Sequence, residues 1–366
     1  MVKRVLQCPI GNMDIGGIEN MLMQIYRNID KEKIQFDFVI HNYSENAYEE
    51  EIYSLGGKIY RIPYISRKPL KHIKEFDKLL KEHSEYEIIH IHTTYAIMFT
   101  DALIAKKNGR KVIVHSHNSS ATKSHVIVHF LFRNTISKLA DYRYACSYIS
   151  GEWMFGKRNQ FNIWKNALVL RGFKFSSCVR KKIREELCIA DDELLLGNVA
   201  RLSYQKNQEL LLYIFKEYSK QNLKSKLVLV GDGEDRSKLE LLSKKYKIEN
   251  KVIFAGNVSN VNEYLMGIDI FCLTSRWEGF GISMLEALST GATVVASNVI
   301  DQRLFGDFDN VNVIQKPLVI NEWLKCIDNI KLLSEKQRME CYDDVCNKGY
   351  EITKQINDIE DLYLSV

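Results

Sequence analysis

The stretch that decides the fold is Arg276–Ala287, which reads RWEGFGISMLEA. An apolar strand pattern, 268–273, comes directly before it, and a helical pattern with one apolar face begins at Ile282. A strand, a glycine turn and a helix form the basic unit of α/β folds. The first backbone N–H groups of such a helix are unpaired and lie at the positive end of its dipole, which favours an anion. This stretch therefore predicts an anion-binding turn at a sheet edge.

Two carboxylates accompany the turn, because Glu278 stands within it and Glu286 lies in the following helix. An ionised carboxylate only accepts hydrogen bonds and repels a phosphate, so its expected ligands are the hydroxyl groups of a sugar or a ribose. From the spacing alone, an ordinary strand–turn–helix with two surface glutamates is an equally good interpretation.

Length and composition indicate a globular protein of two domains. The chain has 366 residues, and single hydrophobic cores rarely extend beyond about 300 residues. No apolar run reaches the ~18 residues that cross a bilayer, and the first residues lack the layout of a signal peptide. The eight cysteines form no CxxC pair, which argues against a zinc site or a disulfide framework. We therefore expect a cytoplasmic location.

Positive charge is concentrated in the first half of the chain. Residues 1–170 contain 24 Lys and Arg against 17 Asp and Glu, whereas the remainder contains 27 against 29. The most basic segment, 61–81, interleaves Lys and Arg with apolar residues at helical spacing, as helices on anionic membranes do. An ordinary solvated helix is the favoured interpretation, and peripheral contact with an anionic membrane is the alternative. We expect no nucleic-acid partner.

Strand and helix patterns alternate along both halves of the chain. The expected strands are 4–8, 36–41, 58–62, 88–92, 111–115, 144–147 and 166–171, followed by 194–200, 227–230, 252–255, 268–273 and 293–297. Repeated βα units predict doubly wound parallel sheets, whose ligands bind beyond the carboxyl ends of the strands. The first domain is expected at 1–170, and the second begins at 171.

The first domain has a glycine loop, 11–17, that matches neither GxGxxG nor a Walker loop, which disfavours a nicotinamide cofactor. Four histidines, His90, His92, His115 and His117, fall at or just past expected strand ends. Their spacing could suit a metal ion, but no acidic or Cys partner lies nearby, so we expect no metal. His117 is the best candidate for a substrate contact or a proton transfer, and a loop residue without a ligand is the alternative.

In the second domain, Arg201, Lys206 and the glycine turn 231–233 all follow expected strands. Cations beside a strand–helix turn can neutralise a diphosphate without a metal ion. Because these groups and the glutamate turn, 278–286, all lie past the ends of parallel strands, we expect them to converge on one sheet edge.

These segments resemble the retaining glycosyltransferases of family 4, whose GT-B fold has two Rossmann-like doubly wound parallel-sheet domains facing a central cleft. The similarity is strongest to bacterial enzymes that build capsular or exopolysaccharide repeat units on a polyprenyl-diphosphate-linked acceptor at the inner face of the membrane. The matching motifs are Gly16–Glu19 (GGIE), His115–Asn118 (HSHN), Val199–Asn207 (VARLSYQKN), Val230–Gly233 (VGDG), and Glu278–Gly281 (EGFG) with Glu286.

The resemblance implies a role for each matching position. Arg201 and Lys206 would bind the donor diphosphate and stabilise it as it departs. Glu278 would accept hydrogen bonds from hexose hydroxyls, and Glu286 from the ribose. His117 would lie near the reacting carbon.

Backbone groups are expected to complete the site. Gly17 would let the first glycine loop approach the diphosphate and the acceptor. The donor's sugar and phosphates would be held by the N–H groups around Gly279, Phe280, Gly281 and Ile282.

In GT-B proteins the last helix crosses back to the first domain, so the expected division is 1–170, 171–349 and 350–366.

The resemblance implies a retaining, metal-independent transferase that moves a hexose from a nucleotide sugar to a glycan or lipid-linked acceptor, with a UDP-sugar favoured over a GDP-sugar and no cofactor. Segments 170–174 and 298–302 depart from the family's usual motifs, which leaves the donor open. A GT-B sugar-nucleotide epimerase and a non-catalytic partner subunit are the alternatives.

Overall fold

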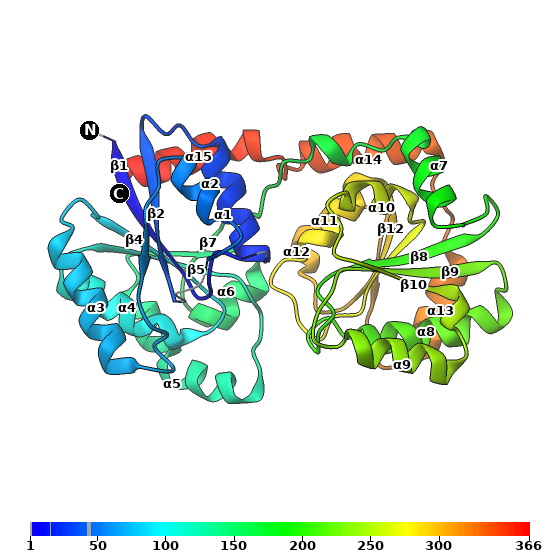
Figure 1. The fold of residues 1–366 in the computed structure, drawn as a ribbon, viewed down its shortest axis with the longest axis horizontal. Helices are drawn as coiled ribbons and strands as arrows, with labels where there is room; N and C mark the ends of the chain where they lie inside the picture. Colours follow the sequence, from blue (N-terminus) through cyan, green and yellow to red (C-terminus); the bar gives the residue numbers. More distant parts are fainter. Residues whose placement is uncertain (1, 15, 42–44) are drawn as a thin grey trace. The chain divides into compact units, whose positions relative to one another are not determined.

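The computed structural model describes residues 2–14, 16–41 and 45–366, which form two compact units (Figure 1). Unit 1 comprises Met1–Val169 and Gly349–Val366, and unit 2 comprises Leu170–Lys348. The units are divided after residues 169 and 348, each one residue before the division expected from the sequence. The C-terminal segment belongs to unit 1, so the chain leaves this unit once and returns to it.

Unit 1 is built on a parallel sheet with the strand order β3-β2-β1-β4-β5-β6-β7. The order reverses between β1 and β4, which is the topological switch point of a doubly wound sheet. The strands are β1 (Lys3–Pro9), β2 (Ile34–Ile40), β3 (Ile59–Arg61), β4 (Ile88–Thr93), β5 (Lys111–Ser116), β6 (Tyr142–Ala145) and β7 (Asn162–Ile163).

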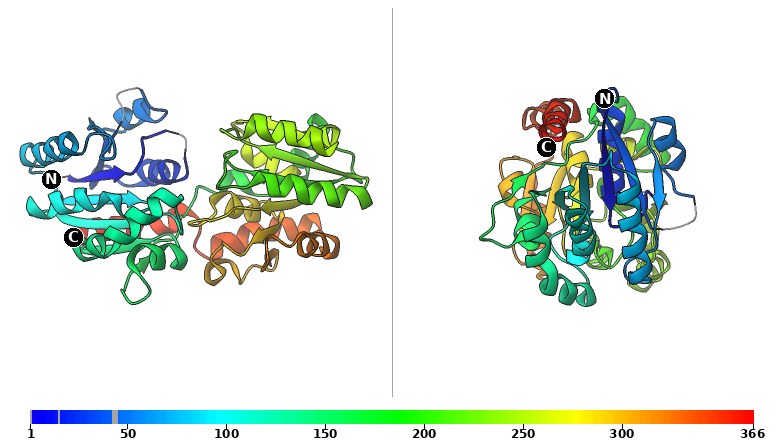
Figure 2. Two further views of the ribbon diagram at one scale, coloured as in Figure 1. Left: turned by 90° about the horizontal axis from the view of Figure 1, so that it is seen from below. Right: turned by 90° about the vertical axis from the view of Figure 1, so that its left-hand side faces the viewer.

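Helices cover both faces of this sheet (Figures 1 and 2). One core cluster joins a sheet face to α1 (Gly17–Asn28), α2 (Glu49–Ser54) and α15 (Ile352–Ser365). The cluster on the other face involves α3 (Pro69–Glu82), η1 (Ala96–Met98), α4 (Phe99–Lys107), α5 (Lys123–Leu139) and α6 (Tyr148–Phe155). Burial on both faces explains why apolar residues occur on both faces of these strands.

Unit 2 repeats this plan, with the strand order β10-β9-β8-β11-β12-β13 and the switch point between β8 and β11. Its strands are β8 (Leu194–Val199), β9 (Ser225–Val230), β10 (Val252–Gly256), β11 (Ile270–Leu273), β12 (Thr293–Ser297) and β13 (Val311–Ile314). Its helices are η2 (Arg171–Phe173), α7 (Ser177–Glu186), α8 (Gln208–Gln221), α9 (Arg236–Tyr246), η3 (Glu249–Lys251), α10 (Val261–Gly267), α11 (Ile282–Ser289), α12 (Gln302–Phe305), α13 (Ile320–Asn329) and α14 (Glu335–Asn347).

Helix α15 is held against unit 1 by polar contacts as well as by its apolar face. The Tyr363 hydroxyl contacts His90 at 2.6 Å, and the side-chain amide of Gln7 donates to the same hydroxyl at 3.2 Å. The Asp30 backbone N–H donates to the Glu360 carboxylate at 2.8 Å. These contacts reach β1 and β4, so the end of the chain takes part in the core of the first domain.

Two parts of the sequence-based strand pattern differ from the structure. The segment 166–171 was expected to be a strand, but the last strand of this sheet is β7, and the segment forms only a bridge from Leu168 to Glu351. Strand β13, which the sequence pattern did not indicate, pairs with β12 at the edge of the second sheet. The predicted fold class, two Rossmann-like parallel-sheet domains, is confirmed. None of the described helices combines the length and apolarity needed to cross a membrane.

Candidate functional site

The first group of candidate residues lies on three loops that follow β8, β9 and β11 in unit 2. Strands β8 and β11 flank the switch point of the sheet, where the loops from neighbouring strands diverge and leave space for a ligand. The fold therefore brings the loops 200–207 and 274–281 together from distant parts of the sequence.

Hydrogen bonds join these two loops directly. The Arg276 N–H donates to the Gln205 carbonyl at 2.8 Å, and the Gln205 side chain donates to the Trp277 carbonyl at 3.1 Å. Asn207, in the left-handed region at φ 56°, donates its side-chain amide to the Thr274 carbonyl at 3.2 Å. Asparagine tolerates this backbone conformation better than most residues. Asn207 was not among the residues for which the sequence predicted a role.

The glycine turn after β9 packs against the first of these loops. A Cβ atom at Gly231 would lie 2.2 Å from the Ala200 carbonyl oxygen, and one at Gly233 would lie 2.3 Å from that of Leu202. These distances are shorter than any van der Waals contact, so both positions require glycine for close backbone approach.

Lys206 and Glu278 form the central contact of the site. The Lys206 Nζ donates to Glu278 Oε1 at 2.8 Å, and the Ser275 hydroxyl donates to the same oxygen at 2.5 Å. Glu278 is buried, whereas the Lys206 side chain remains 23% exposed. Within the described part of the chain both contacts use Oε1, so Oε2 retains its capacity to accept hydrogen bonds from a ligand. Sequence reasoning missed Ser275.

The turn between Glu278 and α11 has the expected glycine geometry. Gly281 is the N-cap of α11 and has φ +94°, a left-handed conformation that favours glycine. Phe280 is buried and its ring contacts Phe305, with centroids 5.1 Å apart. Ile282 is the first residue of the helix, and the backbone from Gly279 leads directly into it. The N–H groups of the first turn lie at the positive end of the helix dipole, where an anion can bind.

Glu286 lies in the second turn of α11. Burial raises the pKa of its carboxyl group to about 7, because desolvation disfavours the charged form. A carboxyl group that titrates near neutral pH can exchange protons at its site.

The side chain of Arg201 contacts Glu234 rather than the Lys206–Glu278 pair. Its guanidinium is exposed and forms a 3.1 Å ion pair with Glu234 on the loop after β9. Such an exposed pair contributes little to stability, and its side chains can exchange partners at low cost. The structure therefore brings Lys206 and Glu278 together beside the glycine turn that precedes α11. Arg201, on the same loop as Lys206, contacts Glu234 instead.

In unit 1, Gly17 is the exposed first residue of α1, and Gly16 is its N-cap. The side chain of Glu19 folds back over this loop: a Cβ atom at Gly16 would lie 2.3 Å from Glu19 Oε2, and one at Gly11 3.2 Å from Oε1. Desolvation, and more weakly Asp14, raises the pKa of Glu19 to about 7. Glu19 is a further residue to which the sequence analysis assigned no role.

The four histidines lie together on the face of the sheet that α15 covers. In the parallel register of β4 and β5, His92 is paired with His115, and His90 lies two residues earlier on the same face. Both ring nitrogens of His92 are hydrogen-bonded: Nε2 contacts Gln7 Oε1 at 2.8 Å, and Nδ1 contacts His117 Nε2 at 3.0 Å. A continuous hydrogen-bonded chain thus runs from Tyr363 through Gln7 and His92 to His117.

This chain sets the tautomer of His117. Since the amide of Gln7 presents its oxygen to His92, the Nε2 of His92 carries a proton and donates it in that hydrogen bond. The Nδ1 of His92 then accepts a hydrogen bond from the Nε2–H of His117. The Nδ1 of His117 then carries a lone pair. Burial lowers the pKa of His117 to about 3, so the ring is neutral near pH 7 and serves as a hydrogen-bond acceptor.

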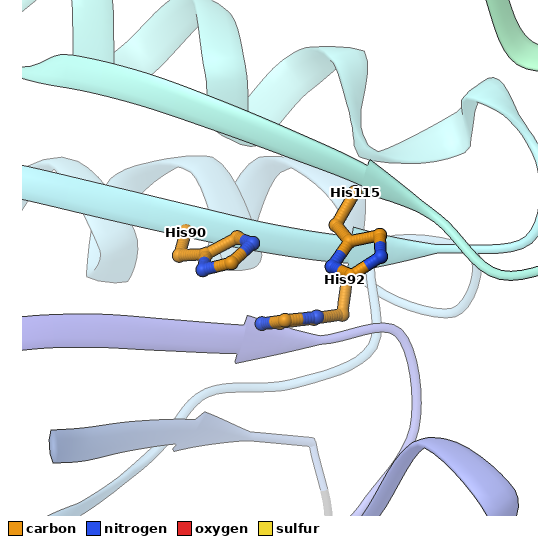
Figure 3. Close-up of side chains that lie close together, drawn as sticks. All are labelled: His90, His92 and His115. Atoms are coloured by element: carbon orange, nitrogen blue, oxygen red, sulfur yellow. The ribbon is translucent and has the colours of Figure 1, made fainter. Parts of the chain in front are cut away.

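His90, His92 and His115 also meet a geometric condition for metal binding (Figure 3), because their ligand atoms lie within 4.8 Å of one another. Burial lowers the pKa of all three rings well below the usual value, which favours the neutral form. However, both nitrogens of His92 are already hydrogen-bonded, so a metal ion would have to displace Gln7 or His117. No carboxylate or thiolate belongs to this described cluster.

Comparison with protein families matches two models to successive parts of the chain. Residues 15–186 match Glycosyltransferase Family 4, and residues 179–316 match Glycosyl transferases group 1. Together they span both units and every candidate residue described above.

Individual relatives extend over almost the whole chain. The putative glycosyltransferase EpsF of Bacillus subtilis is 28% identical, with 99% of this chain and 96% of that protein covered. An Escherichia coli enzyme named UDP-Gal:alpha-D-GlcNAc-diphosphoundecaprenol alpha-1,3-galactosyltransferase is 23% identical, with 96% and 94% covered. The crystal structure of Anabaena HepE in complex with UDP-glucose superposes with a TM-score of 0.77 at 18% identity and covers 99% of both chains, which shows a common fold.

The raised pKa of Glu286 predicts a pH-dependent stability of unit 2. Protonation of Glu286 stabilises the folded state, and this contribution is present below the unfolded pKa of 4.5 and lost as pH rises through about 7. Glu286→Gln should therefore exceed the wild type in free energy of unfolding by roughly 2 kcal/mol at pH 8.5 and match it near pH 4.5.

Urea denaturation at the two pH values measures this difference. Glu340→Gln, an exposed glutamate on α14, is the matched control and should show no pH-dependent difference from the wild type. Equal stability of Glu286→Gln and the wild type at pH 8.5 would contradict the burial of a protonated Glu286.

Proposed function

Because this chain belongs to the glycosyltransferases of family 4 and group 1, we propose that it is a retaining, metal-independent hexosyltransferase that uses a nucleotide-sugar donor. The observation that carries the proposal is the contact of Lys206 and Ser275 with Glu278 beside the glycine turn of α11. A cation, a carboxylate that can accept hydrogen bonds from hydroxyl groups, and the N–H groups of a helix start then lie beside one another at a switch point.

The donor diphosphate is the proposed ligand of the positive groups. Lys206 is partly exposed and fixed in place, and the N–H groups from Gly279 to Ile282 lie at a helix start. Arg201 would leave Glu234 and move onto the diphosphate, which its exposure allows. These groups would stabilise the negative charge that develops on the leaving group, and such electrostatic stabilisation commonly makes the largest contribution to catalysis.

The two glutamates are proposed to bind the hydroxyl groups of the donor. Glu278 would accept hydrogen bonds from the hexose through Oε2, while Oε1 stays with Lys206 and Ser275. Glu286 would accept hydrogen bonds from the ribose, and donor binding would then favour its ionised form. The pairing with Lys206 positions Glu278 before a ligand binds, which lowers the ordering cost of binding.

Retention is proposed to follow from attack on the same face of the sugar. The acceptor hydroxyl would form the new bond to the anomeric carbon as the bond to the diphosphate breaks, and a phosphate oxygen would take the hydroxyl proton. Neither residue is proposed as a nucleophile: Lys206 donates to Glu278, and Glu278 binds Lys206 and Ser275 through Oε1 and the hexose through Oε2. In unit 1, His117 would accept a hydrogen bond from a substrate hydroxyl, and Gly17 would admit the acceptor.

A UDP-sugar is the favoured donor and a GDP-sugar the alternative. Two similar proteins support this choice: one is named as using UDP-Gal, and the other was crystallised with UDP-glucose. The acceptor is proposed to be a glycan or a polyprenyl-diphosphate-linked sugar in the synthesis of a capsule or another surface polysaccharide. The corresponding location is the cytoplasm, with peripheral contact between the basic first domain and the inner membrane face.

The epimerase alternative is less well supported. An epimerase must remove and return protons or cleave and reform its donor's own bond with acid–base groups. Of the histidines that could supply these groups, His90, His92 and His115 are buried with lowered pKa values, and His92 is engaged at both nitrogens. A non-catalytic partner subunit would not need the Lys206–Glu278 arrangement.

Substitutions at the ion pair test the transferase. Lys206→Ala and Glu278→Ala should each lower kcat/KM for nucleotide release by about 10²–10³-fold, because each removes a group that contacts the donor. Release of free nucleotide from a panel of UDP- and GDP-hexoses, with and without acceptor, is the measurement.

Lys224→Ala is the matched control. Lys224 forms an ion pair with Asp192 on the surface of the same unit, and both residues lie before the starts of β9 and β8, at the end of the strands opposite the loops. Full turnover in both Lys206→Ala and Glu278→Ala would refute the assignment, and absence of nucleotide binding in the wild type would favour the partner-subunit alternative.

Metal independence makes a separate prediction. Turnover should be unchanged after exhaustive dialysis against EDTA, since Lys206, Arg201 and the backbone N–H groups would neutralise the diphosphate without a metal ion. Loss of activity that Mg²⁺, Mn²⁺ or Zn²⁺ restores would contradict this part of the proposal.

A further inference from the structure

Helix α5 exposes a group of large apolar side chains that the proposed chemistry does not use. Ile127, Phe130 and Leu131 are 66%, 55% and 68% exposed. At 100° per residue, all three project within an arc of about 100° on the helix surface. Lys123 and Lys138, both exposed, fall within the same arc at the two ends of the helix. One face of α5 is therefore apolar at its centre and cationic at both ends.

The opposite side of α5 is anchored by aromatic contacts. The His129 ring stacks on Trp153 with centroids 3.8 Å apart, and Phe132 stacks on Phe99 at 4.0 Å. The Trp153 indole N–H donates to a backbone carbonyl at 2.9 Å, which fixes this ring in turn. These contacts set the rotation of α5, so the apolar face is held outward by the packing of the domain.

The charges of α5 are all of one sign. The sequence of the helix, KSHVIVHFLFRNTISKL, contains three Lys and Arg residues and no Asp or Glu. Among the described residues, none of these three cations takes part in a salt bridge, and the Arg133 guanidinium lies 5.0 Å from the Phe130 ring centroid. An anionic partner would thus meet cations that no protein carboxylate neutralises.

The basic helix α3, which the sequence indicated as the possible membrane contact, is different. Its lysines pair along the helix with acidic residues, as in Lys71–Glu75, Lys78–Glu82 and Lys81–Asp77. Much of its apolar stripe is buried in the core, including Phe76 and Leu80. Such internal pairing is typical of a solvated surface helix.

We propose that α5 docks on an anionic bilayer surface, with Ile127, Phe130 and Leu131 inserted below the headgroups and Lys123 and Lys138 on lipid phosphates. Apolar side chains flanked by cations bind such interfaces through combined burial and electrostatic attraction. Long lysine side chains at the ends of the apolar segment can reach the headgroups. Docking would give the protein access to a lipid-linked acceptor. This role of the docking rests on the proposed transferase function, whereas the docking itself does not.

Flotation of the full-length protein with vesicles tests the docking. Binding should be clear with phosphatidylcholine vesicles containing about one third phosphatidylglycerol, and weaker with pure phosphatidylcholine or at high salt. Ile127→Ser combined with Phe130→Ser and Leu131→Ser should lower the partition coefficient at least about tenfold. Lys123→Gln with Lys138→Gln should remove most of the preference for anionic vesicles.

Leu70→Ser with Ile73→Ser on α3 is the matched control, because both residues are also exposed and lie on a basic helix. This variant should bind vesicles as the wild type does. Thermal unfolding and nucleotide release with a water-soluble acceptor should be unchanged in every variant, which separates loss of docking from loss of folding or of transferase activity.

Three results would overturn the proposal: no binding of the wild type to anionic vesicles, an equal loss in the α3 control, or unchanged binding of both α5 variants. Conversion of a dimer to a monomer by the serine variant, without any change in vesicle binding, would assign the face to a second copy of the chain. The vesicles contain neither donor nor acceptor, so failure here leaves the transferase proposal standing.

Discussion

The contact of Lys206 with Glu278, at 2.8 Å across 72 residues of sequence, depends on the arrangement of the second sheet. Strands β8 and β11 are neighbours only because the order reverses between them, and their loops are joined by backbone and side-chain hydrogen bonds. A buried carboxylate without a partner would be costly, so Lys206 and Ser275 stabilise Glu278 in its buried position. The pair therefore connects the topology of the domain to its chemistry.

The polar centre of the first domain has the opposite character, since its imidazoles are neutral. Burial lowers the pKa of these rings, and hydrogen bonds from Gln7 and Tyr363 place the C-terminal helix in the same network as His117. A neutral acceptor at His117 suits the orientation of a hydroxyl group, whereas a charged imidazolium would suit a phosphate. The two domains thus differ in their polar groups: the second offers a lysine and the N–H groups of a helix start, and the first offers neutral imidazoles.

The sequence predicted the alternation, the parallel sheets and the glycine turn, because periodicity and glycine placement are local signals. It did not predict that segment 166–171 lacks a strand or that β13 exists, since both depend on pairing at a sheet edge. The ion pair of Arg201 with Glu234 and the backfolding of Glu19 over its loop were also hidden, because they join side chains through tertiary contacts. Ser275 could have been noticed from its position three residues before Glu278.

Calorimetric titration of Glu278→Gln with UDP and with a UDP-hexose tests the central claim most directly. If Lys206 binds the diphosphate and Glu278 binds the hexose, the variant should keep the affinity of the wild type for UDP. It should also lose the additional affinity that the sugar contributes, about tenfold or more for a charge-assisted hydrogen bond. Equal losses for UDP and the UDP-hexose, or no loss for either, would contradict this division of roles.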